Sequence, residues 1–139
     1  MLQKTIVLLS CVKSKEKSPC KAYDMYISSF FKKKKAYAES LNPNSIYILS
    51  AKYGLISLNK DIEPYNQTLK NMKVKERLEW TKDVIQELKQ NCNLREDKFI
   101  LLAGKRYREN IIPCLTNYEI PMEGLRIGQQ MQWLDRQLQ

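Results

Sequence analysis

Three short, uninterrupted apolar runs constrain the fold of this 139-residue chain more than any other feature. Ile6–Leu9, Ile46–Leu49 and Phe99–Ala103 are rich in Ile and Leu and show no alternation with polar residues. Runs of this kind are typical of strands buried on both faces, which occur mainly in parallel sheets. Helix-like segments separate them, with apolar residues at three- and four-residue spacings. The sequence therefore predicts an α/β fold in which helices cover both faces of a mainly parallel sheet.

The expected architecture is a three-layer α/β sandwich with a sheet of about four strands, in a single domain spanning residues 1–139. Residues 51–71 are expected to form one long connection because they contain Gly54, Pro64 and several Asn. The apolar stripes of the first two helices include Ile27 in one, and Val74 and Leu78 in the other. The predicted strands are 4–10, 45–50, 99–103 and a shorter one at 118–120, and the predicted helices are 23–41, 74–88, 107–114 and 128–139.

Composition excludes several classes of protein. No segment reaches the roughly 20 apolar residues of a membrane-spanning helix, and the apolar start is too short for a secretory signal, so we expect a cytoplasmic protein with no membrane partner. The four cysteines have no CxxC spacing and the chain has no histidine, so we expect no metal, no disulfide framework and no cofactor. Without His, proton transfer would have to use Asp, Glu, Lys, Tyr or Cys.

The net charge of +9 is concentrated near the N-terminus, where residues 1–40 carry nine lysines against three acidic residues. This surplus favours an anionic partner, either a nucleic acid or a phosphorylated small molecule, and a lysine-rich solvated surface is the alternative. The run Lys32–Lys35 has the same two interpretations, with Lys32, Lys33 and Lys35 expected to point into solvent.

Polar segments follow each of the three buried strands: Ser10–Lys15, Ser50–Leu55 and Ala103–Tyr107. The carboxyl ends of parallel strands meet at one edge, where α/β sheets bind ligands, so these segments are expected to share a site. The alternative is that the serines cap turns or helices, that Gly54 supplies a turn conformation and that the lysines are solvated. The predicted ligand-binding residues are Ser10, Cys11, Ser14, Lys15, Ser50, Gly54, Tyr65, Gly104 and Tyr107.

The candidate catalytic residues follow the second strand. Glu63 is the candidate acid, base or stabiliser of positive charge on a sugar, with Lys52 and Tyr53 as its partners. A salt bridge between Glu63 and the lysine-rich surface is the alternative. Neither GxxxxGK[ST] nor GxGxxG is present, so the chain has no Walker A loop and no dinucleotide-binding fingerprint.

The segment Ser50–Leu55 (Ser-Ala-Lys-Tyr-Gly-Leu), followed by Pro64-Tyr65, resembles the DUF6884 family of small uncharacterised bacterial and phage proteins. The likeness covers nearly the whole chain and includes Ser10-Cys11 and Ala103-Gly104-Lys105. More distantly, the Leu-Ser-x-x-Tyr-Gly-Leu segment is similar to that of the YaaA peroxide-stress family, which implies DNA binding. A similar segment in domains attached to archaeal tRNA-modifying enzymes implies a Rossmann-like fold related to that of uracil-DNA glycosylases.

Three hypotheses for function remain open. In the first, the strand-end edge binds a nucleotide or nucleic acid, with a reaction on a base or N-glycosidic bond as a further expectation. Ser10, Ser14 and Lys15 would hold phosphate, and Ser50, Lys52 and Tyr53 would form the opposite wall, with Tyr53 or Tyr65 stacking on a base. In the second, a non-enzymatic module binds nucleic acid through lysines 13–35. In the third, an interaction protein sequesters a host factor or signalling nucleotide. The oligomeric state stays open.

Overall fold

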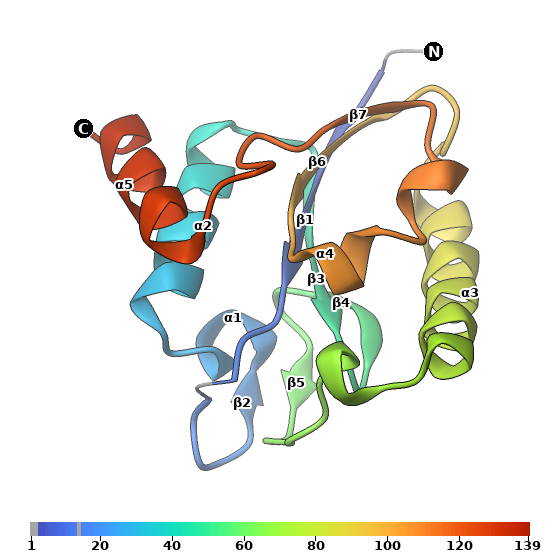
Figure 1. Ribbon diagram of the computed structural model, residues 1–139, viewed down its shortest axis with the longest axis horizontal. Helices are drawn as coiled ribbons and strands as arrows, with labels where there is room; N and C mark the ends of the chain where they lie inside the picture. The colour runs from blue at the N-terminus through green and yellow to red at the C-terminus, as the bar shows by residue number, and fades with distance from the viewer. Residues whose placement is uncertain (1–2, 14) are drawn as a thin grey trace.

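The computed structural model describes residues 3–13 and 15–139 and has a five-stranded sheet at its centre (Figure 1). β1 pairs in parallel with β3 and β6, β7 is parallel to β6, and β4 is antiparallel to β3. The predicted α/β fold with a mainly parallel sheet is therefore confirmed, with five strands instead of about four. The strand order is β4-β3-β1-β6-β7, and the strands are β1 (Thr5–Ser10), β3 (Ser45–Ser50), β4 (Gly54–Ser57), β6 (Lys98–Leu102) and β7 (Asn117–Glu119).

Helices cover both faces of this sheet (Figure 1). α2 (Ser29–Ser40) and α5 (Ile127–Gln137) pack against each other on one side, and α3 (Val74–Asn91) lies on the other. In the part of the chain that the structure describes, no helix has both the length and the apolar character to cross a membrane. The smaller elements are α1 (Ala22–Met25), α4 (Lys105–Arg108), the 3-10 helices η1 (Leu69–Asn71) and η2 (Ile112–Cys114), and a two-stranded sheet of β2 (Cys20–Lys21) and β5 (Asp61–Ile62).

The core is built around β1, the central strand. Val7, Leu8 and Leu9 are fully buried because β3 and β6 flank them within the sheet and helices cover both of its faces. Burial of one such side chain stabilises the folded state by about 1.5–3 kcal/mol relative to leaving it exposed. The absence of polar alternation in this run follows from its position, since neither face of β1 meets water.

The connection after β3 differs from the sequence prediction, because residues 51–71 contain β4, β5 and η1 instead of one irregular loop. β4 folds back on β3 through a tight turn that ends at Gly54, whose φ is 73°. Leu55 and Ile56 point to opposite faces of the sheet and are both buried. A strand of four residues that is covered on both faces gives too little pattern to be recognised.

The predicted helix 23–41 is divided into α1 and α2. The side chain of Ser28 begins α2 by accepting a hydrogen bond from the Phe31 N–H at 3.1 Å. Ile27, which the prediction assigned to the apolar stripe, precedes this cap and is exposed. The predicted helix 107–114 is also shorter, because α4 ends at Arg108 and Pro113 lies in η2.

The buried face of α3 differs from the predicted stripe at its first two turns, where Val74 and Leu78 are exposed. Trp80, Val84 and Leu88 are buried. On this buried face the Trp80 Nε1–H also donates to the Ser50 carbonyl oxygen at 2.9 Å. Tertiary packing, which includes this hydrogen bond, therefore decides which apolar residues of α3 are covered.

The Gly54→Ala substitution is expected to destabilise the protein by about 1–2 kcal/mol, because an L-residue is strained at a φ of 73°. Gly128→Ala is the matched control, since Gly128 lies in α5 and a Cβ there would meet nothing within 4 Å. We expect that change to be neutral or stabilising by up to about 1 kcal/mol. Urea unfolding of both variants is the measurement, and equal effects would contradict a structural role for Gly54.

Candidate functional site

A cleft of about 720 Å³ lies at the carboxyl ends of β1 and β6. Its walls come from the segments that follow these two strands, from α2, from the residues around η1, and from residues 120–130, which lead into α5. Apolar side chains of Phe30, Ile120, Met122 and Ile127 line part of it. The cleft lies at the edge of the sheet where the sequence predicted a site.

Positive charge dominates the cleft. Among the described residues that line it there is no Asp or Glu. Within the same part of the structure, Arg106 is the one cleft cation that is paired with a carboxylate, that of Glu109 at 3.5 Å. The site therefore has a large surplus of basic groups, which is the arrangement that binds anions. The basic residues that line it are Lys13, Lys15, Lys34, Lys70, Lys105, Arg106 and Arg108.

Lys34 is the most unusual of these basic residues, because only 3% of it is exposed. Its Nζ lies 4.4 Å from the centre of the Phe30 ring and 3.5 Å from Ser10 Oγ. Burial lowers the pKa of Lys34 to about 8, and the nearby Cys11 acts in the opposite direction. An ammonium group without a carboxylate partner is costly to hold in such a place, so the fold maintains it against a free-energy penalty.

The ends of β1 and β6 are joined by side-chain hydrogen bonds. Ser10 Oγ accepts from the Gly104 N–H at 3.2 Å, and the Cys11 thiol donates to the Tyr107 hydroxyl at 3.2 Å. Lys15 Nζ donates to the carbonyl oxygen of Lys13 at 3.3 Å. The structure thus brings together five of the predicted ligand-binding residues along the cleft, namely Ser10, Cys11, Lys15, Gly104 and Tyr107.

A second polar cluster, which we call the hydroxyl chain, consists of Ser50, Tyr65 and Tyr26 and does not line the cleft. Ser50 Oγ donates to the Tyr65 hydroxyl at 2.7 Å, and the Tyr65 and Tyr26 hydroxyls are 2.6 Å apart. Burial raises the pKa values of Tyr26 and Tyr65, so both phenols keep their protons at neutral pH. Lys15 lines the cleft, and its Nζ also lies 4.5 Å from the centre of the Tyr65 ring. Lys15 therefore lies between the cleft and the hydroxyl chain.

The three candidate catalytic residues lie outside the cleft. Glu63 is exposed, and its backbone N–H donates to the Tyr53 hydroxyl at 3.1 Å. Lys52 is exposed, with its Nζ 5.2 Å from the centre of the Tyr53 ring. Their catalytic roles stay predictions. Gly54 closes the β3–β4 turn, and the predicted phosphate contact of Ser14 lies outside the described residues.

The run Lys32–Lys35 is largely engaged within the fold. Lys33 forms an ion pair with Asp135 of α5, and Lys35 Nζ donates to the Tyr23 carbonyl oxygen at 3.1 Å. Lys34 is buried, so Lys32 is the lysine of this run that is exposed. The expectation that Lys33 and Lys35 point into solvent holds only in part, because both are half-buried and each has a partner from another segment.

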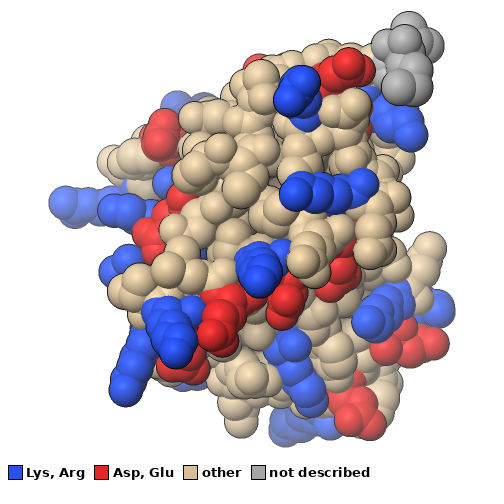
Figure 2. All heavy atoms as spheres, turned by 90° about the vertical axis from the view of Figure 1, so that its right-hand side faces the viewer, with Lys and Arg blue, Asp and Glu red and all other residues tan. Residues whose placement is uncertain are grey.

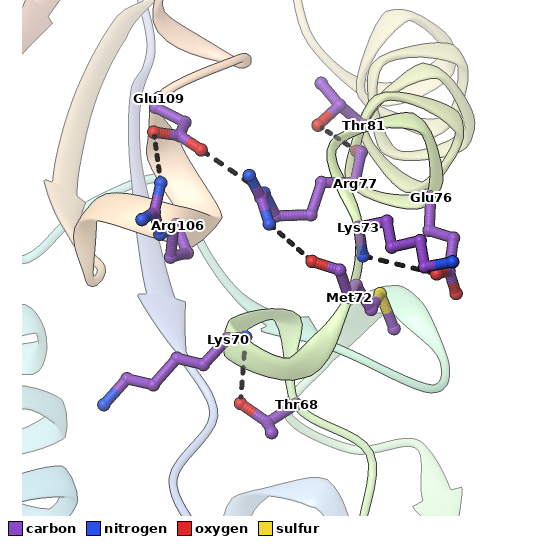
Figure 3. A network of polar contacts seen from close by, with 9 residues as sticks. All are labelled: Thr68, Lys70, Met72, Lys73, Glu76, Arg77, Thr81, Arg106 and Glu109. Atoms are coloured by element: carbon purple, nitrogen blue, oxygen red, sulfur yellow. Dashed lines mark hydrogen bonds and ion pairs between the residues drawn. The ribbon is translucent and has the colours of Figure 1, made fainter.

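An ion-pair network on one rim of the cleft joins η1, α3 and α4 (Figure 3). Arg77 Nε lies 3.5 Å from a Glu109 carboxylate oxygen, and Arg106 contacts the other oxygen at 3.5 Å. Arg77 also donates to the Met72 carbonyl oxygen, which ties α3 to the end of η1. In Figure 3 the Lys70 side chain extends away from this network. The network therefore links the three elements that form this rim of the cleft. The Lys70 ammonium group has no carboxylate partner among the described residues.

Charge on the α3 face is distributed differently. Figure 2 shows that face, and basic and acidic side chains alternate across it. A mixed pattern of this kind is typical of a solvated surface and gives no anion-binding region. The unbalanced positive charge is instead found in the cleft.

Sequence reasoning missed Lys34, Lys70 and Arg108 as cleft residues, whereas Arg106 lies in the segment Ala103–Tyr107 that was expected to share the site. A signal for Lys34 was present, because it lies three positions after Phe31 and four before Ala38, both of which are buried. Residues at those spacings share one helix face. No comparable signal marks Lys70 or Arg108. No group of His, Cys, Asp or Glu among residues 3–13 and 15–139 is arranged to hold a metal ion.

Comparison with known families gives a match over most of the chain. The model of the "Family of unknown function (DUF6884)" matches residues 6–136 of the chain. No curated protein and no solved structure matches it.

Lys34→Met is expected to stabilise the protein at pH 7 by about 3 kcal/mol, because it removes a buried ammonium group. The advantage should shrink as the pH rises from about 8 to 10.5, since folded Lys34 releases its proton near 8 and an unfolded lysine does so near 10.5. Urea unfolding from pH 7 to 9.5 measures the difference from wild type. Lys32→Met, at the exposed lysine of the same helix, is the control and should change the stability at pH 7 by less than about 0.5 kcal/mol. A Lys34→Met protein less stable than wild type would contradict the prediction.

Tyr65→Phe is expected to destabilise the protein by about 2–3 kcal/mol, because it leaves the buried hydroxyls of Ser50 and Tyr26 without their shared partner. Tyr118→Phe, at an exposed tyrosine, is the control and should change stability by less than about 0.5 kcal/mol. Thermal and urea unfolding measure both. If the two variants behaved alike, the hydroxyl chain would not have the structural role assigned to it.

Proposed function

The chain belongs to the DUF6884 family, whose function is unknown, and we propose that its strand-end cleft binds a nucleotide or a short segment of nucleic acid. The observation that carries the proposal is the cleft itself, with seven basic lining residues and no acidic one among those described. Phosphate is the anion that such a site suits best, because Lys and Arg both bind it through charge-assisted hydrogen bonds.

The size and the apolar wall of the cleft support a nucleotide over a small inorganic anion. A volume of about 720 Å³ falls within the range of about 300–1,000 Å³ that is usual for pockets holding small organic ligands. Phe30 and Ile127 offer apolar surface for a base or a sugar, and the lysines offer charge for phosphate. A ligand with one apolar end and one anionic end uses both parts.

We propose that the cleft binds its ligand, without assigning a reaction to it. The candidate acid or base for a reaction at a base or an N-glycosidic bond was the Glu63 carboxylate, and no carboxylate lines the cleft among the described residues. A reaction that involves Glu63 would require that residue to approach the ligand from its exposed position. Of the four lysines in the run 32–35, Lys34 is the one that lines the cleft and so belongs to the proposed site.

Two resemblances of the sequence support the same class of ligand. The Ser50–Leu55 segment followed by Pro64-Tyr65 is similar to that of the YaaA proteins, for which DNA binding is implied. We also propose that the mainly parallel sheet is of the Rossmann-like type found in uracil-DNA glycosylases. Open α/β sheets in general bind ligands outside the carboxyl ends of their strands, which is where this cleft lies.

Lys70→Gln and Lys105→Gln are each expected to weaken nucleotide binding about tenfold, because each removes one charged donor from an otherwise unpaired set. Lys82→Gln is the matched control, since Lys82 is exposed on α3, outside the cleft, and its loss should leave binding unchanged. Isothermal titration with the four ribonucleoside 5′-monophosphates and with a short single-stranded oligonucleotide, at about 50 and 200 mM salt, measures the effect.

Two outcomes would overturn the proposed function. The first is that neither the monophosphates nor the oligonucleotide bind to the wild-type protein. The second is that all three lysine substitutions weaken binding equally, because a non-specific charge effect would not distinguish Lys82 from the two cleft lysines.

A further inference from the structure

The inner end of the cleft contains two buried side chains, Ser10 and Lys34, with more hydrogen-bond donors than the described residues provide acceptors for. Ser10 Oγ accepts from the Gly104 N–H at 3.2 Å and from Lys34 Nζ at 3.5 Å. These two bonds use both lone pairs of the hydroxyl oxygen, so Ser10 can act toward any further group only as a donor. Among the described residues no acceptor receives the Ser10 hydroxyl proton.

Lys34 is in the same situation. Its ammonium group has three N–H bonds, and its hydrogen bond within the described structure is the long one to Ser10. Lys34 is 3% exposed and Ser10 is 4% exposed, and both line the cleft. Buried donors in native proteins are nearly always paired, and a buried charge is costly without a counter-ion. The two side chains thus have the donors and the charge for an anion that the chain itself does not supply.

We propose that Lys34 and Ser10 form a subsite for the terminal phosphate of a phosphomonoester, such as a nucleoside monophosphate. This subsite rests on the function proposed above. It further specifies that the terminal phosphate of the ligand occupies the inner end of the cleft. A terminal phosphate has three free oxygens and about two negative charges near pH 7. It therefore matches one cation with several N–H donors and one adjacent hydroxyl donor.

The depth of the subsite selects a monoester over an internal phosphodiester. Lys34 and Ser10 are both nearly inaccessible, so a group that reaches them must be the end of a molecule. A phosphodiester carries a substituent on each side and only one negative charge, so it would need room for a second chain at the buried end. The exposed cleft residues Lys13, Lys70 and Lys105 remain available to charges nearer the mouth.

The lowered pKa of Lys34, about 8, is consistent with this geometry, because it reflects an ammonium group that is desolvated and lacks a counter-ion. The Cys11 thiol near this lysine donates to Tyr107. Its hydrogen atom is therefore already used, and Cys11 does not compete with Lys34 and Ser10 as a donor to a ligand.

The experiment compares three matched ligands by isothermal titration: a nucleoside 5′-monophosphate, its 5′-phosphate methyl ester and the free nucleoside. Wild-type protein should bind the monophosphate at least about tenfold more tightly than the methyl ester. Lys34→Met should remove this preference, and Ser10→Ala should reduce it several-fold. Lys105→Gln is the control and should weaken both phosphorylated ligands by the same factor, because Lys105 lies at the exposed part of the cleft.

Folding of each variant is checked by thermal unfolding, and Lys34→Met is expected to be at least as stable as wild type. Equal binding of the monophosphate and its methyl ester by wild type would overturn the subsite while leaving nucleotide binding intact. The same conclusion would follow if Lys34→Met weakened both ligands equally. If no nucleotide bound but inorganic phosphate broadened its ³¹P resonance in a Lys34-dependent way, the proposed function would fall and the anion subsite would stand.

Discussion

Parallel pairing of β1 with both β3 and β6 is the constraint on which the cleft depends. Ser10 lies opposite Leu49 in one pair, and Leu9 lies opposite Leu102 in the other, so the segments that follow β1 and β6 leave the sheet at the same level. The hydrogen bond from the Gly104 N–H to Ser10 Oγ then joins the two strand ends directly. Buried apolar side chains and main-chain hydrogen bonds hold this register, so the polar segments are positioned by the core beneath them.

Two polar clusters near the strand ends show how differently buried hydroxyl groups can be used. In the hydroxyl chain, Ser50, Tyr65 and Tyr26 satisfy one another, and the result is a structural link between β3 and the loops beyond it. At Ser10 and Lys34 the donors exceed the acceptors among the described residues. A satisfied network stabilises a fold, whereas an unsatisfied one costs stability, and this cost is the reason for proposing an anion subsite at Ser10 and Lys34.

The strand pattern and the location of the cleft could be predicted because they depend on local sequence. Uninterrupted apolar runs indicate doubly covered strands, and Ser10, Cys11, Gly104 and Tyr107 follow two of these directly. Lys34 was harder to predict as a cleft residue, because it lies in a run of four lysines, and such a run usually indicates a solvated surface. β4 was missed because four residues carry no clear period.

The opposite wall of the cleft illustrates the limit of this reasoning. Ser50 and Tyr53 follow a strand that is parallel to β1, as the prediction required, yet they do not line the cleft. β3 turns back into β4 immediately after Ser50, and the Trp80 side chain of α3 bonds the Ser50 carbonyl oxygen. The wall is formed instead by the residues around η1 and by residues 120–130.

By itself the sequence determined the fold class, the three buried parallel strands and the edge of the sheet at which polar residues gather, since each of these follows from side-chain polarity over a few neighbouring positions. Only the tertiary structure decided which polar residues share the cleft. That choice depends on the turn after β3, on the rotation of α2 that buries Lys34, and on the approach of residues 120–130, which are far away in the chain. Contacts between distant segments are set by packing in three dimensions, and no local pattern specifies them.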